Sequence, residues 1–211
     1  YGQEAENAVA DARQAIAEIL NCQAEDVVFT GCGSESDNLA LRGAALAARR
    51  ERNARHLLIS PVEHHAVSHT AQQLAELHGF ELEYLPVDEY GMVQPADVAS
   101  RLRDDTDLVS VIYANNEIGT INPIGEIGAV CRNRGVPFHS DAVQAGAYLD
   151  LDVQKLNVDL FALGAHKFYG PKGVGVLYVR SGTPLLSALT GGGQESGLRA
   201  GTHNVPYIAG M

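Results

Sequence analysis

Apolar positions along this chain recur with two different periods. Short apolar runs typical of buried strands alternate with longer segments in which apolar residues return every three to four positions, as in amphipathic helices. The apolar stripe of the first helical segment consists of Ala5, Ala8, Val9, Ala12, Ala15, Ile16, Ile19 and Leu20. The pattern predicts that strands and helices alternate along the chain.

The expected strands lie at residues 27–30, 56–60, 81–87, 108–113, 136–140, 160–163 and 174–179. The expected helices lie at residues 4–20, 34–50, 66–78, 96–102 and 124–134. This alternation indicates an α/β fold in three layers, with a mostly parallel sheet and helices on both faces. Residues 181–211 are expected to form an extended segment that leads toward another domain.

Composition agrees with one sizeable domain. The chain has 211 residues, of which 45% are hydrophobic, enough for a real core. The net charge of −11 argues against nonspecific binding to nucleic acid, and no window is apolar enough to cross a membrane. Three cysteines without a disulfide-like pattern favour a reducing compartment, so a cytoplasmic location is expected.

Lys167 is the first candidate for chemistry. The strand-like run 158–165 ends in small residues and is followed by His166, Lys167, a turn rich in glycine and proline, and another β-rich run. A lysine held at a strand end and withdrawn from water can lose its proton near neutral pH and attack a carbonyl group. The alternative is an ordinary surface lysine in a hairpin.

Asp141 follows another apolar strand, and Gln144 comes three residues later. Ligands of open α/β sheets bind beyond the carboxyl ends of strands, so Asp141 and Lys167 would meet if their strands are neighbours. An aspartate and a lysine on one ligand suit pyridoxal 5′-phosphate (PLP). The lysine binds this cofactor covalently, and the aspartate pairs with its pyridinium nitrogen.

A glycine-rich loop, Gly31–Asn38, lies between the strand at residues 27–30 and a helix. Its glycines let the backbone approach an anion, Ser34 is expected to cap the helix, and a helix N-terminus offers free N–H groups. The loop indicates a phosphate site, although such loops occur in many folds. Glu35 and Asp37 are interpreted as helix-start carboxylates without a ligand role.

Two further polar positions fit the same site. His64 follows the strand at residues 56–60, and a neutral imidazole there can stack on a flat ring or simply begin a helix. Asn116 follows the strand at residues 108–113 and can hydrogen-bond a ring hydroxyl. Alternatively, Asn115 and Asn116 are turn formers.

These motifs, taken in order, resemble those of the cysteine desulfurases, fold-type I PLP enzymes of the class-V aminotransferase group. The resemblance is to the iron–sulfur-cluster and nitrogenase type and extends from near Tyr1 to Met211. It is carried by residues 29–38, 63–64, 115–119, 139–141 with Gln144, 166–173 and 191–202. The ordered series is far more specific than any one of its members.

The resemblance implies a role for each matching residue. Lys167 would bind PLP and move the Cα proton, Asp141 would hold the pyridinium nitrogen, and His64 would stack on the ring and take part in catalysis. The other implied cofactor contacts are Gly33, Ser34 and His166 at the phosphate, and Asn116 and Gln144 at the ring oxygen.

The resemblance also implies a homodimer, because Thr202 would reach the phosphate bound to a partner subunit. Gly164 and Ala200 stand where serines are usual in the family. One phosphate donor is therefore expected to be missing, and the affinity for PLP to be lowered.

Residues 1–211 would be the PLP-binding large domain, with a small domain that carries the catalytic loop cysteine outside this chain. The implied reaction removes sulfur from L-cysteine, giving L-alanine and an enzyme persulfide for iron–sulfur cluster assembly or other thiolation, with a sulfur-acceptor scaffold protein as partner. Cys22, Cys32 and Cys131 do not match the loop cysteine. Cys22 and Cys131 are interpreted as packing residues, and this chain alone is expected to release no sulfide.

Other readings remain open. A selenocysteine lyase, another class-V PLP enzyme, or a non-catalytic scaffold that docks partners would share these features. A nicotinamide-binding domain fits less well, because no G-x-G-x-x-G motif follows a strand. His65 and His69 have the spacing of metal ligands on a helix, but they are interpreted as ordinary surface or core residues, and no metal site is predicted.

Overall fold

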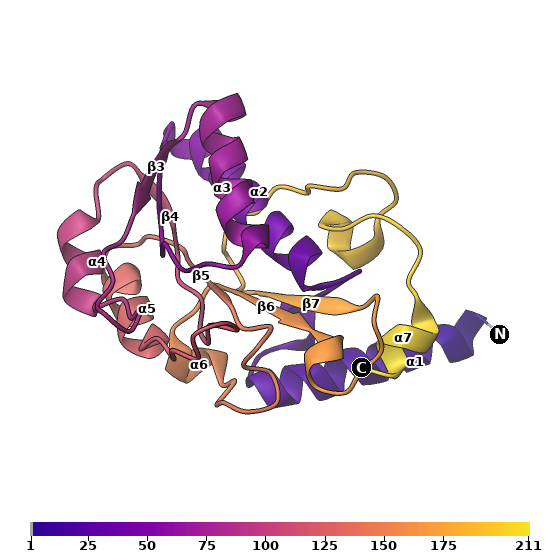
Figure 1. Ribbon diagram of the computed structural model, residues 1–211. Helices are drawn as coiled ribbons and strands as arrows, with labels where there is room; N and C mark the ends of the chain where they lie inside the picture. The colour runs from indigo at the N-terminus through magenta and orange to yellow at the C-terminus, as the bar shows by residue number, and fades with distance from the viewer. Residues whose placement is uncertain (1) are drawn as a thin grey trace.

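The computed structural model describes residues 2–211, which form a seven-stranded sheet with helices on both faces (Figure 1). The strands are β1 (Val27–Thr30), β2 (His56–Ile59), β3 (Glu81–Tyr84), β4 (Thr106–Ser110), β5 (Phe138–Asp141), β6 (Leu160–Gly164) and β7 (Gly175–Val179). The α-helices are α1 (Gly2–Leu20), α2 (Gly33–Arg52), α3 (His65–His78), α4 (Pro95–Arg101), α5 (Ile124–Asn133), α6 (Val153–Leu156) and α7 (Val205–Ala209). Three short 3₁₀ helices are η1 (Ala24–Asp26), η2 (Ala165–Lys167) and η3 (Gln194–Gly197).

The strands are arranged in the order β1-β7-β6-β5-β4-β2-β3. Strands β6, β5, β4, β2 and β3 are mutually parallel, whereas β7 runs antiparallel to both β6 and β1. Because β7 is reversed relative to both neighbours, β1 points the same way as β6. The sheet is mostly parallel, as the alternating pattern predicts.

Helices cover the sheet in two layers, each over its own apolar core. Helices α2 and α3 pack on one face through residues such as Leu41 and Leu74. Helices α1, α4, α5, α6 and α7 pack on the other face, where Leu20, Ile127 and Ile208 are almost fully buried. Apolar side chains on both faces explain why the central strands consist of nearly continuous apolar runs. The predicted three-layer α/β fold is confirmed.

Two predictions near the ends of the chain are wrong. Residues 181–211 do not simply extend away from the sheet, because α7 returns to pack against α1. The yellow C-terminal residues lie beside the indigo N-terminal helix in Figure 1. Ile19 is 64% exposed and does not belong to the buried stripe of α1, whose buried residues are Val9, Ala17 and Leu20.

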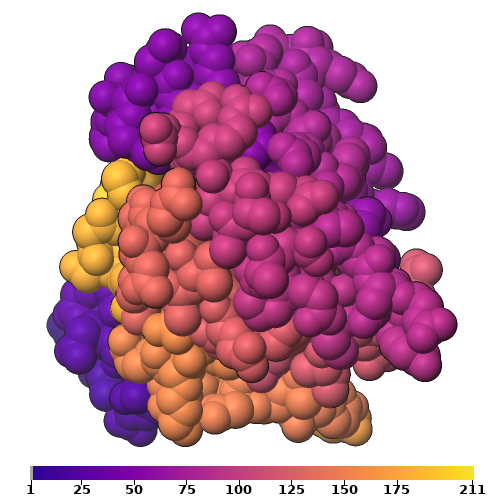
Figure 2. Space-filling model, turned by 90° about the vertical axis from the view of Figure 1, so that its left-hand side faces the viewer, coloured from indigo at the N-terminus to yellow at the C-terminus, as the bar shows by residue number. Residues whose placement is uncertain are grey.

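Figure 2 shows the side of the molecule that lies on the left in Figure 1, where much of the surface is formed by the magenta and pink segments from the middle of the chain. Among residues 2–211, no helix combines the length and the apolar character needed to cross a bilayer.

The direction of the strands decides where polar side chains gather. Strands β1, β2, β4, β5 and β6 all end at the same edge of the sheet. The segments that follow them carry the residues predicted from the sequence. In open α/β sheets, this edge is where ligands bind.

Candidate active site

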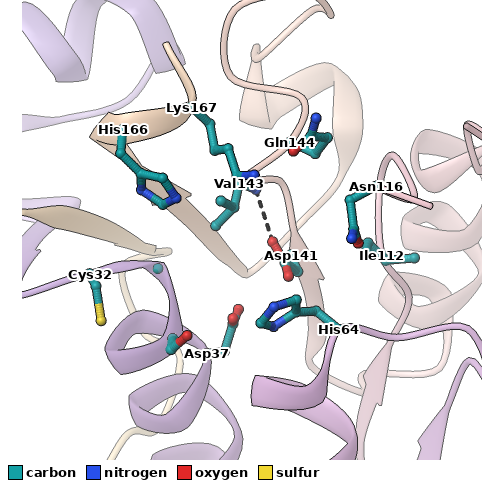
Figure 3. A pocket seen from close by; sticks show the side chains of 12 residues that line it. Cys32, Asp37, His64, Ile112, Asn116, Asp141, Val143, Gln144, His166 and Lys167 are labelled. Carbon is teal, nitrogen blue, oxygen red and sulfur yellow. Dashed lines mark hydrogen bonds between the residues drawn. The ribbon is translucent and has the colours of Figure 1, made fainter. Parts of the chain in front are cut away.

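A cavity of about 200 Å³ opens at the carboxyl edge of the sheet (Figure 3). Every predicted cofactor residue except Thr202 lines it. The lining residues are Cys32, Gly33, Ser34, Asp37, His64, Ile112, Asn116, Asp141, Val143, Gln144, His166 and Lys167. Segments that are far apart in the sequence therefore meet in one pocket, as their positions at strand ends predict.

The first turn of α2 forms one wall of the pocket. Cys32 is the N-cap residue, in an extended conformation, and the helix begins at Gly33. The prediction that Ser34 caps the helix is wrong, because Ser34 already lies inside the first turn and its side chain makes no capping hydrogen bond. Gly33 and Ser34, the first residues of the helix, line the pocket, and a helix N-terminus favours an anion.

Two glycines allow this loop to lie close to its neighbours. A Cβ atom on Gly33 would stand 2.5 Å from Cγ2 of Val143, and one on Gly175 would stand 2.6 Å from the carbonyl carbon of Cys32. Both distances are shorter than real contacts of a Cβ atom. Residues with side chains at these positions would push the loop away from the pocket.

Asp141 is the last residue of β5 and lies on the floor of the pocket, 5% exposed. The backbone N–H of Val143 donates a hydrogen bond of 2.9 Å to its Oδ1 atom, drawn as the dashed line in Figure 3. Burial, with a smaller contribution from the charge of Asp37, raises the pKa of Asp141 to about 7. A cation placed beside Asp141 would stabilise its ionised form.

Lys167 and His166 enter the pocket from η2, immediately after β6. Because β5 and β6 are neighbouring parallel strands, Asp141 and Lys167 reach the same cavity, as predicted. The expectation that Lys167 is withdrawn from water is wrong, since its side chain is exposed in this chain. The tight turn after η2 places Lys167 at the mouth of the pocket and does not bury it.

His64 faces the pocket from the side opposite Lys167 (Figure 3). It is the N-cap of α3, and its Nδ1 atom accepts a hydrogen bond of 3.1 Å from the N–H of Ala66. The proton of the neutral ring therefore lies on Nε2. The reading of His64 as a helix-start residue is confirmed, and its presence in the lining of the cavity leaves the stacking role as a prediction.

The two asparagines after β4 have different surroundings. Asn115 is a turn former: its side chain donates to the carbonyl oxygen of Val62 and accepts from the N–H groups of Glu117 and Ile118. Asn116 is exposed and lines the cavity, so its amide is available to a ligand.

Gln144 brings another amide to the cavity. Its Oε1 atom is buried and has no hydrogen-bond partner among residues 2–211. Buried polar atoms are almost always paired in folded proteins. A ligand group in the cavity would satisfy this atom.

Asp37, which the sequence analysis interpreted as a helix-start carboxylate without a ligand role, lines the pocket. Its side chain is 1% exposed, and its Oδ1 atom has no hydrogen-bond partner among the described residues. Burial raises its pKa to about 8. The available signal was its position four residues after Gly33, which places both residues on the same face of α2.

Thr202 lies outside the cavity, on the exposed surface beside α1. Its segment is tied to the body of the domain through Glu195, whose carboxylate pairs with Arg13 at 2.6 Å and accepts the N–H of Phe29 at 2.8 Å. A second ion pair joins Arg199 to Glu35 at 2.7 Å. These contacts fix Thr202 away from the pocket of its own chain.

Two of the three cysteines are packing residues, as predicted. Cys131 is buried in α5 and Cys22 is half-buried after α1, and burial raises the pKa of each thiol to about 12. Cys32 is exposed and lines the cavity. His65 and His69 are exposed on α3, where their rings stack at 4.6 Å.

The fold and the pocket define an α/β domain with a polar cavity at the carboxyl edge of its sheet. The family model for aminotransferase class-V matches residues 1–211. The chain belongs to this family.

Similar proteins agree with this assignment. "Cysteine desulfurase IscS" from Clostridium botulinum is 47% identical over 211 residues, which are 100% of this chain and 52% of the relative. The protein with the same name from Methanosarcina thermophila is 48% identical over 210 residues, 100% of this chain and 51% of the relative. A solved structure titled "SspA in complex with cysteine" superposes with a TM-score of 0.93 at 41% identity, over 99% of this chain and 60% of that one. The chain spans about half the length of the curated relatives that it matches.

Proposed function

We propose that this chain is the PLP-binding large domain of a cysteine desulfurase, an enzyme that removes sulfur from L-cysteine and leaves L-alanine. The observation that carries the proposal is the meeting of Lys167 and Asp141 in one cavity beside the N-terminus of α2. PLP requires a lysine that binds it covalently, an aspartate that pairs with its ring nitrogen and a site that binds its phosphate. The names of the relatives support the choice of substrate and reaction.

The cavity fits PLP on several independent points. Because Gly33 has no side chain, the first turn of α2 packs closely against Val143, and its N-terminus lies at the cavity, where it can bind a phosphate. Ser34 and His166 lie beside it as further phosphate donors. On the ring side, the buried and unpaired Oε1 atom of Gln144 can accept a hydrogen bond from the ring hydroxyl, and Asn116 offers a second amide.

When bound, PLP supplies an aromatic cation that accepts the electron pair released at the substrate Cα. Asp141 contributes by favouring a proton on the ring nitrogen, which its negative charge stabilises. Lys167 provides an amine that holds the cofactor and, once released from it, takes the proton from Cα. His64, whose Nδ1 atom is occupied by the N–H of Ala66, would stack on the ring.

The proposed enzyme needs groups that this chain does not place in the cavity. A second copy of the chain would bring Thr202 to the phosphate, and its position outside its own pocket supports this homodimer. A loop cysteine outside residues 1–211 would accept the sulfur and pass it to an acceptor protein. The buried Cys22 and Cys131 are unsuited to this task because their thiols stay protonated. Three free cysteines fit a reducing location such as the cytoplasm.

The proposed function is tested by measuring alanine and sulfide from L-cysteine with the full-length protein that contains this chain, PLP and a thiol reductant. We expect turnover that Lys167→Ala lowers by about 10²–10⁴-fold or more. Lys172→Ala is the matched control, because Lys172 lies in the following turn and outside the cavity. Residues 1–211 alone should stay at the background of free PLP. Equal loss in both variants, or turnover with selenocysteine alone, would contradict the proposal.

A further inference from the structure

Buried carboxylates gather beneath the cavity around Asp141. Asp37 and Glu63 are 1% and 8% exposed, and each carries an oxygen without a hydrogen-bond partner among residues 2–211. One oxygen of Asp37, one oxygen of Asp141 and one nitrogen of His64 all lie within 4.8 Å of one another. Figure 3 shows these three side chains pointing toward one another. Two buried carboxylates this close cannot both be ionised without a large cost.

His139 lies behind Asp37 and is completely buried in β5. Its Nε2 atom is 3.4 Å from Oδ1 of Asp37, and its Nδ1 atom is 2.9 Å from the hydroxyl of Ser110. The hydroxyl can donate or accept, so it accommodates either tautomer of a neutral ring. The Nε2 atom of His139 and the Oδ1 atom of Asp37 have no hydrogen-bond partner in the described chain. One proton between these two atoms would satisfy both.

We propose that Asp37 is a positioning residue that, together with His139, holds one proton behind Asp141 and so leaves Asp141 as the ionised member of the pair. Asp141 would then present its negative charge to the cationic ring of the cofactor. This last step rests on the proposed function, whereas the sharing of the proton is a property of the protein alone.

The surroundings favour this distribution of charge. Burial lowers the pKa of His139 to about 4, so its ring is neutral and cannot neutralise both carboxylates. Burial raises the pKa of both carboxyl groups, so one of the two keeps a proton near neutral pH, and Asp37 is the one with the neutral ring of His139 at 3.4 Å to share it. The other titratable groups around the pair are Glu63, His64, His166 and Lys167.

The proposal fixes the order in which the two carboxyl groups ionise. Asp141 loses its proton beside a neutral Asp37, and Asp37 then loses its proton beside a charged Asp141, so the repulsion between the charges acts on the second step. Removing the charge of Asp141 should therefore lower the titration midpoint of Asp37, whereas replacing Asp37 by a neutral residue should leave the midpoint of Asp141 nearly unchanged. A purely structural Asp37 would affect stability without this asymmetry.

The experiment titrates aspartate labelled with ¹³C at the carboxyl carbon, by NMR, in the protein without cofactor. In Asp141→Asn we expect the midpoint of Asp37 to fall by about one pH unit. In Asp37→Asn the midpoint of Asp141 should stay close to the wild-type value, so each variant is informative if the other does not fold. Asp107→Asn is the matched control, because Asp107 is also buried and without a partner among residues 2–211 but lies near the amino end of β4. Unchanged midpoints in both variants, or a larger fall for Asp141 than for Asp37, would overturn the proposal.

A second measurement follows PLP binding between pH 5.5 and 8.5. Wild-type affinity should fall as the pH drops through the midpoint of Asp141, and Asp37→Asn, which is neutral like protonated Asp37, should keep this profile. Asp107→Asn should also leave the profile unchanged. If no variant binds PLP, the proposed function fails while the titration result stands. If the fall moves to lower pH in Asp37→Asn, Asp37 carries the negative charge in the wild type and the positioning role is wrong.

Discussion

Gly33 shows at the scale of one residue how the backbone shapes the pocket. Its missing side chain lets the first turn of α2 lie directly against Val143, two residues beyond Asp141. The same contact joins the proposed phosphate and ring-nitrogen sites. The distance between the proposed phosphate site and the proposed ring-nitrogen site therefore depends on a contact that only glycine permits.

We predict that Gly33→Ala weakens PLP binding at least about tenfold, or about 1.4 kcal/mol. The added methyl group would stand 2.5 Å from Val143 and push the helix N-terminus away from the phosphate. Titration of PLP absorbance measures the effect. Gly193→Ala serves as the control, since a Cβ atom there meets nothing within 4 Å and the backbone φ is −85°. Equal affinity in Gly33→Ala and wild type would show that the loop does not hold the phosphate.

Most pocket residues could be predicted from the sequence because each follows a strand. Asp141, Lys167, His64 and Asn116 were found this way, and the parallel strands bring them together. The place of Asp37 in the pocket was missed because it lies in the second turn of a helix, where its burial depends on the packing of α2 over the sheet. The exposure of Lys167 could not be predicted either, since the depth of a cavity depends on all the segments around it.

Elements were predicted more reliably than their ends. The strand expected at 108–113 is observed as Thr106–Ser110, because its first residues are polar yet fully buried. The register between β2 and β4 shifts near Asp107, so this strand departs from a simple apolar run. Helix α7 was missed because it has only five residues and is held by packing on α1, which local sequence does not reveal.

At the scale of the strand β4, we predict that Asp107→Asn stabilises the domain against unfolding. Both carboxylate oxygens of Asp107 are unpaired, and burial raises its pKa from 3.8 to about 7. Between these pH values the unfolded chain has lost a proton that the folded chain retains, so stability falls as the pH rises. Asparagine does not titrate. The gain in the free energy of unfolding of Asp107→Asn over the wild type should therefore grow from about pH 4 to pH 7 and then stay constant.

Denaturant unfolding at pH 5 and pH 8 measures this effect. The gain from Asp107→Asn should be larger at pH 8, by on the order of 2 kcal/mol. Asp104→Asn is the control, because Asp104 is fully exposed and should show no such pH dependence. If Asp107→Asn raises the free energy of unfolding equally at both pH values, ionising the buried Asp107 does not destabilise the fold.

At the scale of the whole molecule, the residues proposed to contact PLP lie in two different places. The sheet collects the cavity residues at one edge, while the segment anchored by Glu195 holds Thr202 on the surface beside α1. A site completed by a second copy is the arrangement that gives Thr202 a role. The sequence suggested this only through the family resemblance, because no local pattern indicates a contact between chains.

We predict that Lys167→Ala and Thr202→Ala subunits complement each other. Each variant alone should fail to bind PLP tightly on a lysine. In a mixed dimer, the Thr202→Ala subunit keeps Lys167 and receives an intact Thr202 from its partner, so one complete site forms. Refolding the two variants together and measuring PLP labelling tests this. Labelling that is no better in the mixture than in the separate variants would assign Thr202 to its own chain or to no site.

The central claim is that this cavity holds PLP on Lys167. The most direct measurement incubates the protein with excess PLP, reduces it with borohydride, digests it and maps the modified peptide by mass spectrometry. We expect a yellow protein that loses its colour on reduction and carries the label on Lys167. Label on Lys155 or Lys172, or no label at all, would contradict the claim.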